Sequence, residues 1–185
     1  MNYKRWNELQ RYEKENEVIE GRVKVIKPYG AFIELSNGTT GLLPIENICV
    51  SRIRSPYDCI QVGEKIKVRI QSLDEKKKRV LLTHKELLGT WEDNVKTVKE
   101  GSQMVAVVRE KEQKKNGVFI ELKPNLVGMA EYDENLHYGE QVKVYIKKID
   151  AQKKKIKVAV VDEMTNLDDC VNSLYNRNEV EESFE

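Results

Sequence analysis

Two stretches of this 185-residue chain follow the same pattern of residues. The segment YGAFIEL at residues 29–35 aligns with NGVFIEL at residues 116–122, and residues 62–68 align with residues 138–144. The second copy gains two residues before the first aligned segment and loses eleven before the second. A repeat of this length exceeds the unit of a solenoid, so the pattern indicates a small domain that occurs twice.

Each copy consists of short runs that are rich in β-branched residues and alternate between apolar and polar side chains. Turn residues separate these runs, which in the first copy include residues 18–27, 31–35, 65–73 and 79–83. Five short strands in about seventy residues favour a closed barrel, because closure removes exposed sheet edges. The sequence therefore predicts an all-β fold of two tandem five-stranded OB-type β-barrels, at residues 18–84 and 101–160.

The segments that flank the barrels have a helical pattern. We expect an N-terminal helical segment over residues 1–17, with the helix itself over residues 7–17. A short helical linker over residues 85–100 joins the two barrels. Its helix is expected over residues 84–96, and Gly89 weakens the middle of that helix.

Charge is distributed unevenly along the chain. The net charge of +1 at pH 7 combines a basic body with an acidic tail. The tail, residues 161–185, holds eight acidic residues and one Arg and carries a net −7, so residues 1–160 carry +8. Because the tail is also poor in large apolar residues, we expect disorder or a loose helix there.

Several functional classes are not expected. No apolar run approaches the roughly 18 residues that a membrane span needs, and the first residues lack the apolar run of a secretory signal. The three cysteines, Cys49, Cys59 and Cys170, lack metal-ligand spacing and suit thiols of a reducing cytosol. The two histidines, His84 and His137, have no metal or catalytic spacing, so we expect no metal, no cofactor and no catalysis.

Strand alternation assigns the side chains of the aligned segments to two faces. In the first copy, the apolar residues at every second position form the core face, which leaves Phe32 and Glu34 on the outer face. The second copy places Phe119 and Glu121 outside in the same way. An outward aromatic residue at the same position of both repeats indicates a binding surface.

The fourth strand of each copy presents basic residues on the same outer surface. Lys67 and Arg69 alternate with core positions in the first copy, and Lys143 does so in the second. The turns that follow are also basic, at residues 76–79 and 153–155. An exposed ring among cations suits single-stranded nucleic acid, because bases stack on the ring while the cations contact phosphates. The alternative is that these lysines only keep a small barrel soluble.

The first copy resembles the S1 RNA-binding domain of the bacterial ribosomal protein S1 family. The resemblance covers nearly all of residues 17–84. It is carried by residues 21–35, 41–44, 62–63, 68–74 and 79–83. The second copy, about residues 101–160, is similar but degenerate. The tryptophan-containing segments before the barrels resemble the spacers of multi-domain members, and we expect Trp6 and Trp91 to pack against the barrels that follow, with base stacking as the alternative.

The resemblance implies an OB-fold barrel that binds single-stranded RNA. In the family, two aromatic residues stack on bases, and these positions fall on Tyr29 and Phe32. An acidic and a basic residue near the last turn contribute beside them, here Asp74 with Arg79 or Lys78. Strand alternation supports Phe32 directly. It places Tyr29 on the same face only if the glycine between them bends the strand.

The second copy departs further from the family. Asn116 replaces the first aromatic residue, and Glu131 stands where the first copy has a proline and the family often has a histidine. The remaining candidate RNA-binding residues are Phe119, Asp150 and Lys155. With one ring and an added carboxylate, this barrel is expected to bind RNA weakly, as a secondary contact, or to dock a protein partner.

Two functions from different classes follow from these observations. The first is binding of single-stranded RNA with low base specificity, in translation or mRNA handling, by an S1-like factor. The second is a protein-interaction adaptor that docks on the ribosome or another RNA-processing machine and has little RNA affinity of its own. In either case we expect a cytoplasmic monomer that is not an enzyme and does not bind membranes.

Overall fold

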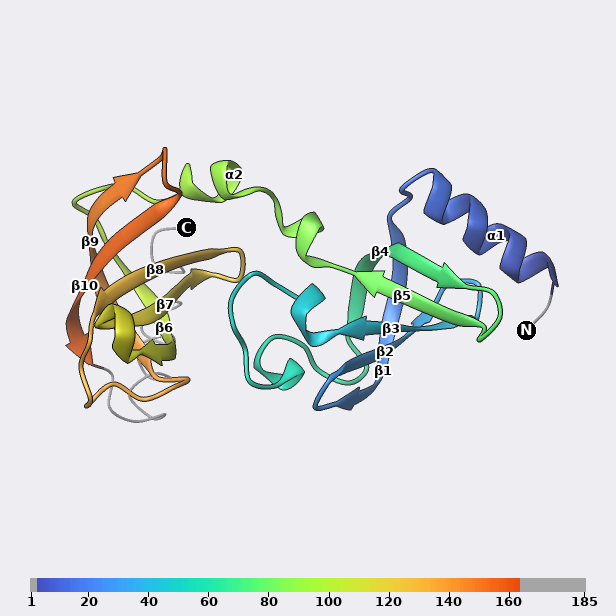
Figure 1. Cartoon of the computed structure of the whole chain (residues 1–185), viewed down its shortest axis with the longest axis horizontal. Coiled ribbons are helices and arrows are strands. Elements are labelled where there is room, and N and C mark those ends of the chain that lie inside the picture. The colour runs from blue at the N-terminus through green and yellow to red at the C-terminus, as the bar shows by residue number, and fades with distance from the viewer. Residues whose placement is uncertain (1–2, 164–185) are drawn as a thin grey trace, which may run out of the picture. The chain divides into compact units, whose positions relative to one another are not determined.

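The computed structural model describes residues 3–163 and divides the chain into two compact units, with the division between Trp91 and Glu92 (Figure 1). Each unit contains a closed barrel of five strands, which confirms the predicted fold class. The acidic tail, expected from residue 161, begins later than predicted, because the last strand continues to Glu163. The remainder of that tail lies outside the described residues.

The first barrel is built from antiparallel neighbours closed by one parallel contact. Its strands are β1 (Ile19–Lys27), β2 (Gly30–Leu35), β3 (Thr40–Pro44), β4 (Lys65–Asp74) and β5 (Arg79–Thr83). They follow the order β1-β2-β3-β5-β4 around the barrel, and β3 pairs with β5 in parallel at Leu42 and Leu81. The connection from β3 to β4 contains two short 3₁₀ helices, η1 (Ile45–Asn47) and η2 (Pro56–Asp58).

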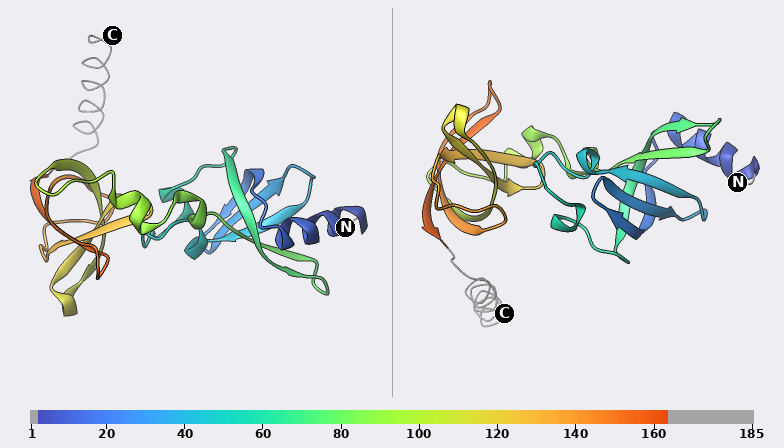
Figure 2. Two further views of the ribbon diagram at one scale, coloured as in Figure 1. Left: turned by 90° about the horizontal axis from the view of Figure 1, so that it is seen from above. Right: turned by 60° about the horizontal axis from the view of Figure 1, so that its bottom comes forward.

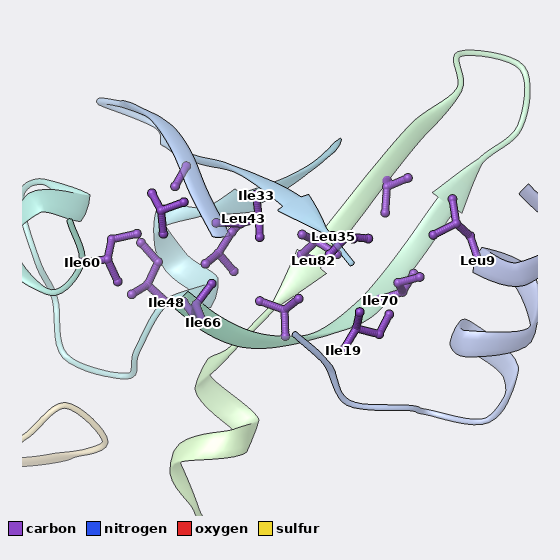
Figure 3. Packing of buried hydrophobic residues seen from close by; sticks show 14 of the residues in the cluster. Leu9, Ile19, Ile33, Leu35, Leu43, Ile48, Ile60, Ile66, Ile70 and Leu82 are labelled. Carbon is purple, nitrogen blue, oxygen red and sulfur yellow. The ribbon is translucent and has the colours of Figure 1, made fainter. Parts of the chain in front are cut away.

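The core of the first barrel follows the predicted alternation. Ala31, Ile33 and Leu35 of β2 are buried, as are the apolar residues at alternate positions of β4. Figure 3 shows these side chains converging from the strands and from the connection between β3 and β4. Burial of such side chains in each strand is the main source of stability for a barrel of this size.

An N-terminal helix completes this core. Helix α1 spans Tyr3–Lys14, so the expected range of residues 7–17 was wrong at both ends. It ends where Asn16 adopts a left-handed conformation with φ of 50°, which a helix cannot continue through. Its Trp6 and Leu9 are buried in the core of the first barrel, which confirms the packing role expected for Trp6.

The second barrel repeats this topology. Its strands are β6 (Gln103–Glu112), β7 (Gly117–Lys123), β8 (Leu126–Glu131), β9 (Gln141–Asp150) and β10 (Lys155–Glu163). They follow the order β6-β7-β8-β10-β9, and β8 pairs with β10 in parallel at Met129 and Lys157. Figure 2 shows the strands of this barrel as a ring around a common centre.

Backbone hydrogen bonds confirm the alignment of the two copies. The N–H of Val23 donates to the carbonyl of Glu64 at 2.9 Å, and the N–H of Val108 donates to the carbonyl of Glu140 at 2.8 Å. Both pairs lie at the aligned entry to the fourth strand. The repeated sequence therefore folds into a repeated barrel, and the two copies share this hydrogen bond.

The segment between the last strand of the first barrel and the first strand of the second is not one helix. It contains a 3₁₀ helix, η3 (Lys85–Leu88), and a short α-helix, α2 (Trp91–Val95). Between them Gly89 has φ of +90°, so the glycine expected to weaken the helix interrupts it. Trp91 is half-buried. Within residues 3–163, no helix is both long and apolar enough to cross a membrane.

Candidate nucleic-acid interface

The first barrel carries a hollow of about 660 Å³ along β2, β3 and the turn between β4 and β5. We refer to it as the first hollow. Five of the residues predicted to bind RNA line it: Tyr29, Phe32, Asp74, Lys78 and Arg79. The fold therefore gathers two aromatic rings, one carboxylate and two cations that are up to fifty positions apart in the sequence.

The two rings of the first hollow stand edge to face. Their centroids are 6.3 Å apart and their planes are perpendicular. Phe32 is half-buried, between its cross-strand neighbours Val25 on β1 and Leu42 on β3. Tyr29 is 55% exposed, so most of its ring is open to a ligand. This apolar strip lies on the side of β2 opposite the core, as strand alternation predicts for Phe32.

Tyr29 reaches Phe32 because it is not part of the strand. Lys27 of β1 pairs with Gly30 of β2, so Tyr29 lies in the tight turn that joins them, where alternation does not apply. Gly30 packs closely on β3: a Cβ atom at Gly30 would lie 2.4 Å from the carbonyl oxygen of Leu43. Only glycine permits this approach, which fixes the turn beside the outer face of β2.

The charged residues of the first hollow belong to the turn between β4 and β5. The Oδ1 atom of Asp74 accepts a hydrogen bond from the N–H of Lys77 at 3.1 Å, which holds the turn. Lys78 follows in a left-handed conformation with φ of 52°, and Arg79 begins β5 opposite Asp74. The carboxylate therefore positions the two cations as well as lining the hollow itself.

A further contact of this turn was not predicted. The Nζ atom of Lys78 lies 4.9 Å from the centroid of the Trp6 ring, within the range of a cation–π interaction. Trp6 is buried beneath it. Helix α1 thus supports the position of a cation in the first hollow. The sequence carries a weak signal for this contact, since Trp6 is the one large aromatic residue of α1 expected to pack on the barrel.

Of the predicted candidates, Lys67, Arg69 and Lys143 line neither hollow, and nor does Asp150 of the turn between β9 and β10. Lys67 and Arg69 occupy outward positions of β4, and Lys143 occupies the equivalent position of β9. The backbone carbonyl of Lys67 contacts the Nδ1 atom of His84 at 2.6 Å. The structure therefore does not bring these three residues together with the aromatic rings.

The second barrel carries an equivalent hollow of about 520 Å³, which we refer to as the second hollow. Phe119 and Lys155 line it, as does Glu131, which pairs with Gly117 as Pro44 pairs with Gly30. Four more lysines join Lys155 in its lining: Lys115, Lys147, Lys154 and Lys157. Of these lysines, the sequence placed Lys154 and Lys155 in one basic turn and predicted only Lys155 as a site residue.

The second hollow lacks a counterpart of the Tyr29 ring for a conformational reason. The carbonyl of Asn116 accepts the N–H of Tyr132 at 3.0 Å, just as the carbonyl of Tyr29 accepts the N–H of Ile45 at 3.0 Å, so the positions are equivalent. Asn116, however, has φ of 51°. This left-handed conformation suits asparagine and disfavours bulkier residues.

Asp150 holds the turn between β9 and β10. Its Oδ1 atom accepts the N–H groups of Lys153 and Gln152, each at 3.1 Å. These backbone hydrogen bonds, that of Lys153 first, lower the pKa of Asp150 below its usual value. Asp150 does not line the second hollow, so its position supports a role in shaping the turn that presents Lys154 and Lys155.

The expectation that Glu121 is exposed on the outer face was wrong. Glu121 is buried and forms an ion pair with Arg109, Nη2 to Oε2 at 3.2 Å. The guanidinium of Arg109 lies 5.3 Å from the centroid of the Tyr138 ring. In the first barrel, Glu34 pairs with Lys24 at 3.2 Å, and both side chains stay about half exposed. Neither carboxylate is isolated, because each has a cation on the adjacent strand.

Two cysteines come together in the connection between β3 and β4. The Sγ atoms of Cys49 and Cys59 are 3.7 Å apart. The spacing of the two cysteines in the sequence did not predict this contact. The irregular path of the connection between β3 and β4 sets their distance. Cys170 lies outside the described residues.

Comparison with known proteins identifies the first barrel. The sequence profile of the S1 RNA binding domain matches residues 12–85, which include the end of α1 and the whole barrel. The small ribosomal subunit protein bS1 of Rickettsia conorii is 32% identical over 160 residues, covering 80% of this chain and 28% of that protein. A 4-hydroxy-3-methylbut-2-enyl diphosphate reductase of Clostridium acetobutylicum is 30% identical over 168 residues, covering 84% of this chain and 25% of the reductase.

These relatives are much longer than the chain. It spans about a quarter of the length of these two curated relatives. Among solved structures, the solution structure of GSP13 from Bacillus subtilis is 25% identical, covers 40% of this chain and 58% of that chain, and superposes with a TM-score of 0.38. The profile match and the barrel topology together carry the assignment: residues 12–85 form an S1 RNA-binding domain, and the chain is distantly similar to the bS1 ribosomal proteins.

Proposed function

We propose that this chain binds single-stranded RNA and that the first hollow is its main contact. The observation that carries the proposal is the gathering of Tyr29 and Phe32 with Lys78 and Arg79 in one hollow. Aromatic rings stack on bases and cations attract phosphates, so the hollow offers both halves of a nucleotide a complementary surface.

The orientation of the rings favours a single strand over a duplex. Stacked bases of a duplex lie parallel, whereas the planes of Tyr29 and Phe32 are perpendicular. Two bases that stack on these rings must turn away from each other, which an unpaired strand can do. Stacking accepts any base and phosphate contacts carry no sequence information, so base specificity is expected to be low.

The second barrel is proposed as a weaker, secondary RNA contact. Its hollow offers one ring, and Glu131 adds a negative charge that repels phosphates. The same departure favours a second candidate for this barrel, the docking of a protein partner on the ribosome or another RNA-processing machine. Five lysines line the second hollow and support its role as a secondary RNA contact.

We further propose that the chain acts in translation or mRNA handling, as a cytoplasmic monomer without catalytic activity. The similarity to the bS1 ribosomal proteins supports the process. The similarity to a reductase covers a quarter of that enzyme, and the first hollow combines rings and cations without a converging acid–base pair.

The test is a competition between RNA forms. The full chain is titrated with a fluorescently labelled, unstructured RNA, and the complex is then challenged with unlabelled single strand or with a duplex of the same sequence. The proposal predicts that the single strand displaces the label at much lower concentration than the duplex. Equal competition by the duplex would contradict the argument from the perpendicular rings.

A further inference from the structure

The second hollow is unusual in how much positive charge surrounds it. Five lysines line it, against the single carboxylate of Glu131. Lys154 forms an ion pair with Glu92 at 3.0 Å, and Lys115 lies 3.9 Å from Glu112. Among residues 3–163, no ion pair neutralises the other three, which are Lys147, Lys155 and Lys157.

The lining of the second hollow is also partly apolar, since it includes Phe119, Val127, Met129 and Val158. A ligand that fits both the apolar residues and the lysines therefore combines a planar or apolar group with negative charges on either side of it. A nucleotide has this composition, and so does a peptide in which an aromatic residue stands between carboxylates.

The chain itself contains such a peptide. Residues 179–185 read EVEESFE and hold four glutamates and Phe184. Glu182 and Glu185 stand on either side of the ring in the sequence. The ring can take the place of a base, and the carboxylates can take the places of the flanking phosphates.

We propose that residues 179–185 dock in the second hollow of the same chain and exclude RNA from it. Phe184 packs on Phe119 and Met129, and the glutamates face Lys147, Lys155 and Lys157. The exclusion of RNA rests on the proposed function, whereas the docking does not.

The attachment of the tail suits this docking. Lys155, Lys157 and Val158 of β10 form one wall of the hollow, and the tail continues from the end of the same strand at Glu163. Six residues of strand from Lys157 to Glu163 span about 20 Å. Fifteen residues separate Glu163 from residue 179, and a random coil of fifteen residues has an end-to-end distance of about 20 Å, the length of strand that separates Glu163 from Lys157. A tether of this length gives the peptide a local concentration on the order of millimolar.

The second hollow is a better match than the first for such a peptide. Each hollow holds one carboxylate, but the first holds only two cations, and one of them, Lys78, already lies over the Trp6 ring. The second hollow also belongs to the unit from which the tail leaves. The lysines, the apolar residues of the lining and the attachment of the tail therefore all favour docking in the second hollow.

Nuclear magnetic resonance of the full chain tests the docking without RNA. The methyl group of Met129 serves as the probe, because a docked aromatic ring shifts its resonance. Phe184→Ala is expected to move the Met129 methyl signal and to leave that of Met104 in place. Tyr175→Ala, a tail aromatic outside residues 179–185, is the matched control and is expected to leave Met129 unmoved. An unchanged Met129 signal in Phe184→Ala, or an equal shift in Tyr175→Ala, would overturn the docking.

A second measurement separates the docking from the exclusion of RNA. In a full chain whose first hollow is disabled by Tyr29→Ala and Phe32→Ala, the four glutamates of residues 179–185 are replaced by glutamine. Residual RNA affinity at low salt is expected to rise by roughly tenfold. A Met129 shift without any gain in RNA affinity would leave the docking established and would overturn its competition with RNA. In that case the RNA role of the second barrel fails, and that of the first does not.

Discussion

At the scale of single residues, the site depends on which side of a strand a ring occupies. Phe32 and Ile33 are neighbours in β2, yet Ile33 is fully buried while Phe32 lies half-buried on the opposite face. The same parity holds for Phe119 and Ile120 in the second barrel. Alternation along one strand therefore separates a residue that stabilises the barrel from one that is available to a ligand.

This separation predicts opposite effects for two adjacent substitutions. Phe32→Ala is expected to lower RNA affinity by roughly 1–3 kcal/mol, the range for one lost stacked base, and to leave the barrel folded. Ile33→Ala is expected to cost about 2–5 kcal/mol of stability through an emptied core position. Fluorescence anisotropy with RNA and chemical denaturation measure the two effects. If Phe32→Ala unfolds the barrel, the ring belongs to the core and the binding face has been misassigned.

Strand alternation could predict Phe32, but not every residue of the first hollow. It could not place Tyr29, because that residue lies in a turn whose geometry depends on the close approach of Gly30 to β3. It also gave Glu121 as exposed, because alternation says nothing about a cation such as Arg109 on the neighbouring strand. The face that a residue occupies on its strand can be predicted from the sequence, whereas contacts between strands depend on the register in which the strands pair.

At the scale of elements, helix α1 belongs to the first barrel as firmly as its strands do. Trp6 is 3% exposed and Leu9 is fully buried, although the helix lies outside the range that strand patterning assigned to the barrel. Trp6→Ala is therefore expected to destabilise the first barrel by about 3–5 kcal/mol in chemical denaturation. Tyr3→Ala, at a residue that is 79% exposed on the same helix, is the control and should change stability by less than about 0.5 kcal/mol. Equal effects of the two substitutions would show that α1 does not pack as described.

The turns between the last two strands of each barrel depend on a carboxylate. The folded pKa of Asp150 lies below the ordinary 3.8, so its hydrogen bonds contribute stability above that pH and lose it as the pH falls through the folded pKa. Asp150→Asn lacks this titration. The stability difference between the natural chain and Asp150→Asn is therefore expected to shrink as the pH falls below 3.8, measured by thermal unfolding. A difference that stays constant through this range would mean that the carboxylate does not hold the turn.

The order of elements was largely predictable, and their ends were not. The repeat and the alternation gave the strands, because each period reflects one buried face. The helix expected over residues 84–96 was wrong because Gly89 takes a positive φ that ends the 3₁₀ turn before it. The close approach of the Cys49 and Cys59 thiols was not predictable, because it depends on the irregular path between β3 and β4.

At the scale of the whole molecule, the two barrels share a topology, but their hollows are lined by different residues. The first hollow has two rings, while the second has one ring and Glu131. In the full chain, Phe32→Ala is therefore expected to weaken RNA binding more than Phe119→Ala, because the first hollow supplies most of the stacking. Comparing the two variants in one anisotropy series checks this order. A larger loss for Phe119→Ala would make the second barrel the main contact.

The distribution of net charge along the chain also affects RNA binding at the scale of the whole molecule. The described barrels belong to a body that carries +8, and the residues from 161 onward carry −7. Attraction of RNA to the body releases counterions, so affinity is expected to fall as salt rises. The negative charge of the residues from 161 onward is expected to oppose this attraction, by an amount that also falls as salt rises.

The most direct measurement is a salt series of single-stranded RNA binding by the natural chain and by the Tyr29→Ala, Phe32→Ala double variant. The natural chain is expected to bind with an affinity that falls as salt rises. The double variant should bind more weakly at every salt concentration but show a similar salt slope, because stacking is lost while the cations remain. Equal affinities of the two proteins, or binding that does not change with salt, would contradict an RNA site built from these rings and cations.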